Sequence, residues 1–115
     1  NLNEFKLPDI ILGDVHGKSC DPSITNLIES ILRRQGYNIL RNKFYSGGFC
    51  TSNYGRPAEN MHAIQIEINR ALYMDETNYI KINNFKKIKK DISNLIRDLS
   101  KKQLPLNIKY NSAAE

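Results

Sequence analysis

The chain has 115 residues, of which 40% are hydrophobic and 25% charged, so we expect one folded domain rather than a disordered chain. No apolar run approaches the ~20 residues that a membrane-spanning helix needs, and no signal peptide is visible, which favours a soluble, cytoplasmic protein. The net charge of +5 is uneven, because residues 81–110 carry nine Lys or Arg against two Asp. Any nucleic-acid interface would therefore depend on that segment alone.

The N-terminal part predicts a strand, a helix and a second strand in succession. The apolar run LPDIILGD, residues 7–14, is typical of a buried strand. The stretch CDPSITNLIESILRRQG predicts a helix that Asp21 caps, that begins at Pro22 and that Gly36 ends. The stretch YNILRN predicts another short strand. A strand, a helix and a strand with short connections indicate a βαβ unit with parallel strands.

The segment from Lys43 to Pro57 predicts a loop, because three glycines and Pro57 indicate sharp turns. The loop also contains aromatic and cationic side chains, among them Tyr54 and Arg56. A long loop with such groups is more often functional than a simple connection. We therefore expect part of a binding site here.

The segment His62–Asn69 predicts a strand with two chemically different faces, followed by a short helical turn over 70–74. The isoleucines at 64, 66 and 68 alternate with Gln65, Glu67 and Asn69. An ionised carboxylate is costly to bury without a partner, so Glu67 should be paired, protonated or exposed to a wet cleft. A structural ion pair with Arg70 and a general base in a cleft are both open at this point.

The last clear element is an amphipathic basic helix within residues 84–103, from about Phe85 to Lys102. Its apolar stripe consists of Phe85, Ile88, Ile92, Leu95, Ile96 and Leu99. The lysines opposite this stripe are typical of a solvated face, and no aromatic residues alternate with them, which disfavours nucleic-acid binding. Pro105 ends the helix, and the remaining tail carries only weak signals.

Asp14 and His16 follow the first strand, where ligands often bind in open α/β sheets. The two side chains could be a pair of metal ligands or simply a polar loop. Together, His16, Cys20, Cys50 and His62 match no standard structural zinc pattern. The chain also has no nucleotide-binding glycine motif and no G-x-S-x-G motif, which disfavours these classes of site.

Two segments together resemble the C-terminal half of N-formylglutamate amidohydrolases, from about Leu7 to Glu76. The segments are PDIILGDVHGKSCDP and FYSGGFCTSNYGRPAENMHAIQIEINRALYMDE, with the elements G-G, Y-G-x-P and H-A-x-Q-I-E-I-N-R-x-L-Y-M in order. The resemblance implies an α/β fold with a mixed, mainly parallel sheet flanked by helices. We expect residues 1–115 to form one domain with part of this zinc-carboxypeptidase-like (phosphorylase/hydrolase-like) fold.

The resemblance also implies an activity, the hydrolysis of N-formyl-L-glutamate or a related N-acyl amino acid to glutamate and formate in histidine degradation. A metal-activated water would attack the formyl carbon. Glu67, in the Q-I-E-I-N-R element, would be the general base. The substrate-binding candidates are Tyr54, Arg56, Asn69 and Arg70, since guanidinium groups can bind carboxylates with two hydrogen bonds.

The chain departs from the family in its metal ligands, which lie mostly in an N-terminal half that this sequence does not show. The element GDVHG is not the family's D-x-H-S element, so Asp14 and His16 are only weak metal candidates. A divalent metal, zinc by the resemblance, is expected in the complete enzyme and not in this chain alone. We expect association with a separate N-terminal half or a homo-oligomer. The alternative is a catalytically inactive truncated remnant or an interaction module.

Overall fold

A computed structural model describes residues 7–43, 47–75, 80–81, 84–102 and 106–108. In chain order the elements are β1 (Ile10–Gly13), α1 (Pro22–Arg34), β2 (Ile39–Arg41), α2 (Phe49–Tyr54), η1 (Pro57–Glu59), β3 (His62–Ile68), η2 (Arg70–Leu72), β4 (Met74–Asp75), β5 (Ile80–Lys81), α3 (Asn84–Lys101) and β6 (Leu106–Ile108). None of the helices in these ranges is long and apolar enough to cross a membrane.

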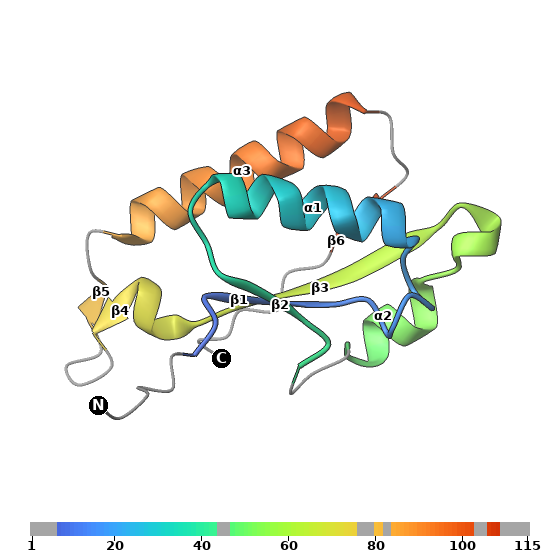
Figure 1. Ribbon diagram of the computed structural model, residues 1–115, viewed down its shortest axis with the longest axis horizontal. Coiled ribbons are helices and arrows are strands. Elements are labelled where there is room, and N and C mark those ends of the chain that lie inside the picture. Colours follow the sequence, from blue (N-terminus) through green and yellow to red (C-terminus); the bar gives the residue numbers. More distant parts are fainter. Residues whose placement is uncertain (1–6, 44–46, 76–79, 82–83, 103–105, 109–115) are drawn as a thin grey trace, which may run out of the picture.

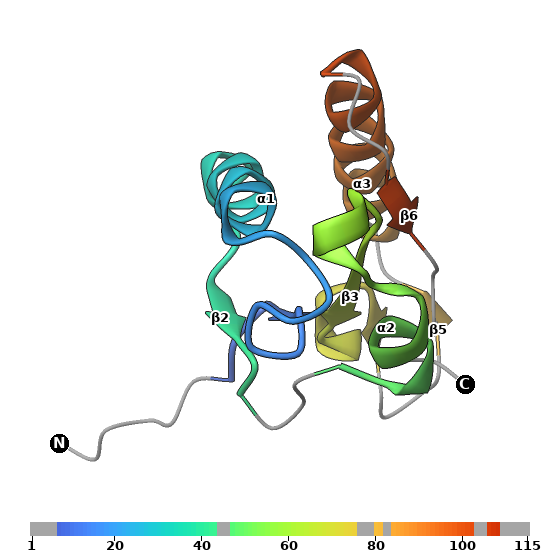
Figure 2. The same ribbon diagram turned by 90° about the vertical axis from the view of Figure 1, so that its right-hand side faces the viewer.

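Four strands form a mixed sheet in the order β2-β1-β3-β6, and β4 pairs with β5 in a separate two-stranded sheet. The β1–β2 and β3–β6 pairs are parallel, whereas the β1–β3 pair is antiparallel. Both long helices, α1 and α3, lie on the same side of the four-stranded sheet (Figures 1 and 2). The expected α/β fold with a mixed, mainly parallel sheet flanked by helices is confirmed.

The hydrophobic core lies between the helices and one face of this sheet. The register pairs Ile10 with Ile39 and Ile68, and Leu12 with Ile66, so these side chains share one face. Ile10, Leu12 and Ile39 belong to the same buried cluster as the apolar residues of α1 and α3. The isoleucine face of β3 therefore faces the core, as its alternation predicts.

Helix α1 begins and ends at the predicted residues. The Asp21 carboxylate accepts a hydrogen bond of 2.8 Å from the Ser23 backbone N–H, and Pro22 is the first helical residue. Gly36 follows the helix with a φ of +100°, a conformation that favours glycine. Strands β1 and β2 precede and follow α1 in the chain and pair with each other in parallel, so the predicted βαβ unit is confirmed.

Helix α3 is held against the end of α1 by polar contacts as well as by its apolar stripe. The Tyr37 hydroxyl donates to Asp91 Oδ2 at 2.5 Å, and Lys87 Nζ lies 2.8 Å from the same oxygen. Lys87 Nζ also lies 4.7 Å from the centre of the Tyr37 ring. Burial, together with the hydrogen bond to Asp91, raises the pKa of Tyr37 to about 12.

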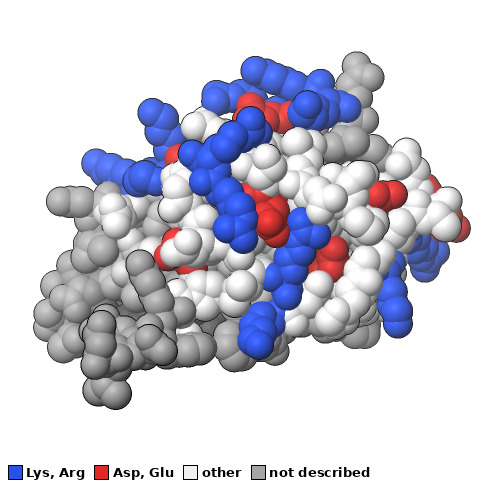
Figure 3. Space-filling view, viewed as in Figure 1, with Lys and Arg blue, Asp and Glu red and all other residues white. Residues whose placement is uncertain are grey.

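The solvent-facing side of α3 is basic, as its sequence predicts. Lys86, Lys89, Lys90 and Arg97 are exposed, whereas Ile88, Ile92, Leu95 and Leu99 are buried. Lys and Arg side chains gather over this helix in the space-filling view (Figure 3).

One prediction needs correction, and one strand was not predicted. The segment Lys43–Pro57, expected as a loop, contains the six-residue helix α2. Its residues, FCTSNY, have weak helix propensity, so contacts with β3 and the Gly48 carbonyl stabilise it rather than its own sequence. The tail after Pro105, which carried only weak signals, adds β6 to the sheet beside β3. Such short strands depend on their neighbours and leave little pattern in the sequence.

Candidate active site

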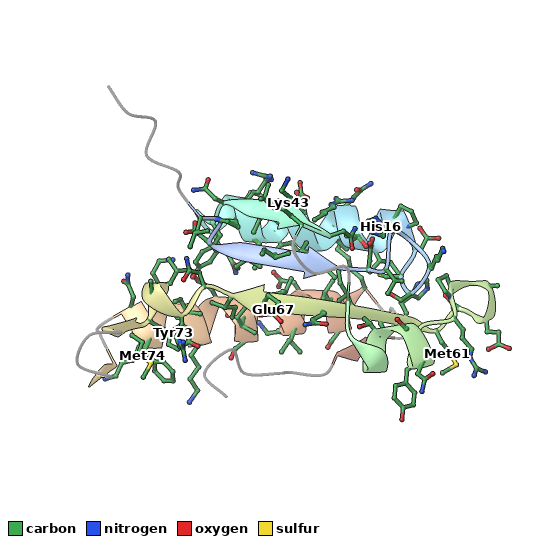
Figure 4. All side chains as sticks on the ribbon, turned by 90° about the horizontal axis from the view of Figure 1, so that it is seen from below. His16, Lys43, Met61, Glu67, Tyr73 and Met74 are labelled. Atoms are coloured by element: carbon green, nitrogen blue, oxygen red, sulfur yellow. The ribbon has the colours of Figure 1, made fainter. Side chains whose placement is uncertain are left out.

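Glu67 lies near the middle of the sheet on the face opposite the core. It pairs with Ile11 of β1, and both belong to the strand face that alternates with the core face. Figure 4 views the sheet from the side away from α1 and α3 and shows Glu67 within β3. The side chain is half-buried and lines an open hollow of about 450 Å³. The other lining residues are Leu7, Pro8, Asp9, Ile11, Ile68 and Asn69.

The Glu67 carboxylate is held by a neighbour on its own strand. Gln65 Nε2 donates a hydrogen bond of 2.7 Å to Glu67 Oε1. Gln65 Oε1 in turn accepts a hydrogen bond of 2.7 Å from the Gly48 backbone N–H, just before α2. A continuous chain of hydrogen bonds therefore connects the Gly47–Gly48 turn to the Glu67 carboxylate. These hydrogen bonds hold the side chains of Gln65 and Glu67 in defined positions on the polar face of β3.

Asn69 and Arg70 lie at the same end of β3 as Glu67. Asn69 lines the hollow, and its backbone N–H donates to the Asp9 carbonyl at 2.8 Å. Its side-chain oxygen accepts from the Ala71 backbone N–H at 3.1 Å and so caps η2, whose first residue is Arg70. Two of the four predicted substrate-binding residues therefore follow Glu67 directly in the chain, at the end of β3.

Tyr54 and Arg56 lie near the other end of β3. Arg56 forms an isolated bridge with Met61, which is six residues from Glu67 along extended chain, about 20 Å. Its guanidinium is exposed and lies 3.7 Å from the Glu59 carboxylate. Tyr54, the last residue of α2, is 46% exposed. The structure thus places Tyr54 and Arg56 away from the Glu67 carboxylate, although all three were predicted to belong to one site.

Asp14 has the environment of a structural carboxylate. Its oxygens accept hydrogen bonds from Asn42 Nδ2 at 2.9 Å, Thr25 Oγ1 at 2.9 Å and the Gly17 backbone N–H at 3.1 Å. Burial alone would raise the pKa of the Asp14 carboxyl, but these hydrogen bonds outweigh it and hold the pKa below its usual value. Asp14 therefore braces the loop that follows β1.

His16, the other weak metal candidate, has an exposed side chain on that loop and a φ of +53°. Nowhere in the described ranges do three or more His, Cys, Asp or Glu side chains form a group that could hold a metal ion. The geometry therefore gives Asp14 and His16 no additional ligand within the part of the chain that is described.

Cys20 and His62 have structural surroundings as well. Cys20 is completely buried, and its burial raises the pKa of the thiol, which fits a packing role better than a nucleophile. The buried His62 accepts a hydrogen bond from the Asp21 backbone N–H at Nδ1, so its Nε2–H donates to Asn60 Oδ1 at 3.2 Å. Both ring nitrogens of His62 are therefore engaged by the protein.

Gln65 and Gly48 are the site residues that sequence reasoning did not single out. Gln65 is two positions from Glu67, and residues at that spacing share a strand face, so the sequence did contain a signal for it. The contribution of Gly48 arises from a contact across 17 positions of the chain. No local pattern shows such a contact.

Comparisons with known proteins agree on one family. A sequence model of N-formylglutamate amidohydrolase matches residues 1–74. N-formylglutamate deformylases from Pseudomonas putida and Pseudomonas aeruginosa are each 38% identical over 78 and 77 residues, which is 67% and 66% of this chain. A crystal structure of N-formylglutamate amidohydrolase from Ralstonia eutropha JMP134 superposes with a TM-score of 0.72 and 37% identity, over 82% of this chain and 35% of that one. The chain spans 29% of the length of either deformylase.

Proposed function

This chain belongs to the N-formylglutamate amidohydrolase family, and we propose that it contributes Glu67 as the general base of an amidohydrolase of the N-formylglutamate deformylase type. The proposed reaction converts N-formyl-L-glutamate, or a related N-acyl amino acid, to glutamate and formate, in cytoplasmic histidine degradation. One observation carries the proposal: Glu67 sits half-exposed at an open hollow, on the sheet face opposite the hydrophobic core.

In the proposed mechanism, Glu67 Oε2 accepts a proton from a water molecule as the water oxygen bonds to the formyl carbon. The same carboxyl then returns the proton to the leaving nitrogen as the C–N bond breaks, which yields formate and the free amine. Asn69 and Arg70, at the same end of β3, would bind the carboxylates of the substrate. General acid–base catalysis of this kind typically accelerates a reaction about 10²- to 10⁴-fold.

A divalent metal, zinc by the family resemblance, does not fit the described residues alone, because they contain no suitable group of three or more ligands. We propose that its ligands come from residues outside this part of the chain. The association partner would be a separate N-terminal half or another copy of the chain.

The proposal can be tested in a chimera in which residues 1–74 replace the corresponding segment of the Pseudomonas putida deformylase. We expect the chimera to hydrolyse N-formyl-L-glutamate, and we expect Glu67→Gln to lower kcat about 10²- to 10⁴-fold. Gln keeps the hydrogen bond from Gln65 but cannot accept the proton. The matched control is Glu59→Gln, an exposed glutamate paired with Arg56, which should leave kcat unchanged.

Near-full activity of the Glu67→Gln chimera would rule out the general-base role. A folded chimera that binds zinc but shows no turnover would favour the alternative, an inactive remnant or interaction module. If the chimera does not fold, the 115-residue chain is mixed with the remaining deformylase fragment and zinc chloride, and formate release is measured.

A further inference from the structure

We infer that Gln65 is a positioning residue that orients the Glu67 carboxylate, and that the Gly47–Gly48 turn holds Gln65 in place for this purpose. The inference rests on the proposed function of Glu67 and adds a residue to that site. The three groups form a continuous chain of hydrogen bonds, from the Gly48 N–H to Gln65 Oε1 and from Gln65 Nε2 to Glu67 Oε1.

The orientation of the Gln65 amide follows from the chemistry of its two partners. A backbone N–H can only donate, so Gly48 must face the amide oxygen of Gln65. The amide nitrogen, which can only donate, is then directed at Glu67 Oε1. The hydrogen bond from this donor holds one oxygen of the Glu67 carboxylate in a defined position.

Gly48 itself is fixed by the beginning of α2. Its carbonyl accepts hydrogen bonds from Thr51 Oγ1 at 3.0 Å and from the Ser52 backbone N–H at 3.1 Å. Thr51 itself is buried. The turn therefore presents the Gly48 N–H to Gln65 from a fixed direction.

Both glycines lie close to neighbouring side chains in this arrangement. Gly47 has a φ of +133°, and a Cβ there would lie 3.0 Å from Val15 Cγ2 and 3.1 Å from Thr51 Oγ1. A Cβ on Gly48 would lie 3.2 Å from Gln65 Oε1. A side chain at Gly47 would be strained by this φ, and a side chain at Gly48 would have to shift the Gln65 amide by a few tenths of an ångström.

Holding one carboxylate oxygen leaves the other free to meet the water molecule in a fixed direction. Displacing a catalytic group by about 1 Å can cost about 100-fold in rate. We therefore expect the loss of the Gln65 contact to lower kcat about 10- to 100-fold in the chimera and to change KM less than twofold. A merely structural link between α2 and β3 would change stability and leave kcat unchanged.

The hydrogen-bonded chain is tested first in the 115-residue chain itself, by ¹H–¹⁵N NMR. In Glu67→Gln, which lacks the charged acceptor, the side-chain amide protons of Gln65 should move upfield. In Gln65→Met, which lacks the acceptor for the Gly48 N–H, the backbone amide proton of Gly48 should move upfield. Neither signal should move in the control Glu59→Gln. Unchanged Gln65 and Gly48 signals in folded variants would overturn the inference.

The catalytic consequence is then measured in the chimera with two variants of Gln65. Gln65→Met removes both contacts, whereas Gln65→Glu can still accept from the Gly48 N–H but cannot donate to Glu67. Positioning predicts a lower kcat in both variants, whereas a structural link alone predicts normal kcat in Gln65→Met. A lower kcat in Gln65→Glu alone would come from the negative charge added beside Glu67 and would count against positioning. Equal kcat in the parent and both variants would overturn the inference. If the parent chimera shows no turnover, the proposed function fails, and the NMR result still decides whether Gln65 orients Glu67.

Discussion

At the scale of single residues, Gly55 leaves the least space for a side chain among the glycines at positions 17, 36, 47, 48 and 55. A Cβ built there would be 2.4 Å from the Ser19 carbonyl oxygen and 2.5 Å from Ser19 Cα. Ser19 cannot yield easily, because its hydroxyl donates to the Ala63 carbonyl at 2.8 Å and its own carbonyl accepts from the Ala63 N–H at 2.8 Å. Gly55 is therefore required for α2 and the following turn to approach the start of β3.

We predict that Gly55→Ala lowers the free energy of unfolding by about 2–4 kcal/mol, because the new methyl group has to displace backbone. The control is Gly36→Ala, where a Cβ meets nothing within 4 Å but the φ of +100° is strained for alanine. That strain should cost only about 1–2 kcal/mol. Urea unfolding followed by circular dichroism measures both, and equal losses would show that the contact with Ser19 can relax.

At the scale of elements, the contact between the end of α1 and α3 should become weaker at alkaline pH, because it involves the Tyr37 hydroxyl. Because the pKa of Tyr37 is raised from 10.0 to about 12 in the folded chain, its neutral form is stabilised by folding. This contribution is fully present below pH 10 and is lost as the pH rises from about 10 to 12. We predict a steeper loss of stability over that range in the parent chain than in Tyr37→Phe.

The measurement is urea unfolding of both proteins between pH 9 and 12, with tyrosinate absorbance followed in parallel. Near neutral pH, Tyr37→Phe should cost about 1 kcal/mol, since it removes the hydrogen bond to Asp91 but keeps the ring beneath Lys87. Identical pH dependence in the two proteins would mean that the Tyr37 hydroxyl is not a source of alkaline sensitivity.

The long elements could be predicted from the sequence because their patterns are local. Helix α1 carries its own cap, first-turn proline and terminal glycine, and β3 alternates isoleucine with polar residues over its whole length. Helix α2, β4, β5 and β6 could not be predicted, because each is short and depends on contacts with distant segments. The ends of an element are best predicted where the sequence contains a capping residue, such as Asp21 for α1.

The candidate site was predictable only in part. The alternation along β3 placed Gln65 and Glu67 on one face, and the structure confirms that this face is opposite the core. Residue type suggested Arg56 as a substrate-binding residue, but residue type carries no information on distance, and the structure places Arg56 near the other end of β3. The Gly48 contact depends on how α2 packs against β3, which the sequence does not show.

At the scale of the whole molecule, the sheet has an edge strand and exposed apolar side chains. β2 is at one edge of the described sheet, and Leu40 on this strand is 42% exposed. Leu40 pairs with Ile11, so it lies on the face that carries Glu67, opposite the helices. An unpaired edge beside exposed apolar residues favours association with another polypeptide.

We therefore predict that the purified chain associates. Size-exclusion chromatography with light scattering should give a mass above the 13.3 kDa of one chain. Leu40→Lys should reduce the associated fraction, because it places a charge on the exposed sheet face. The matched control is Ser93→Lys on the solvent-facing side of α3, which should leave the mass unchanged. A stable monomer at all concentrations would contradict the prediction.

The paired register of β1 and β3 also constrains how this segment can change during evolution. Alternate residues of β3 serve two different environments, so inserting or deleting one residue ahead of Glu67 would turn the carboxylate inward and an isoleucine outward. Substitutions at single positions leave this parity intact. Each position of the strand can therefore change only to residues that suit its own face, whereas the length between Ala63 and Glu67 can change only in steps of two.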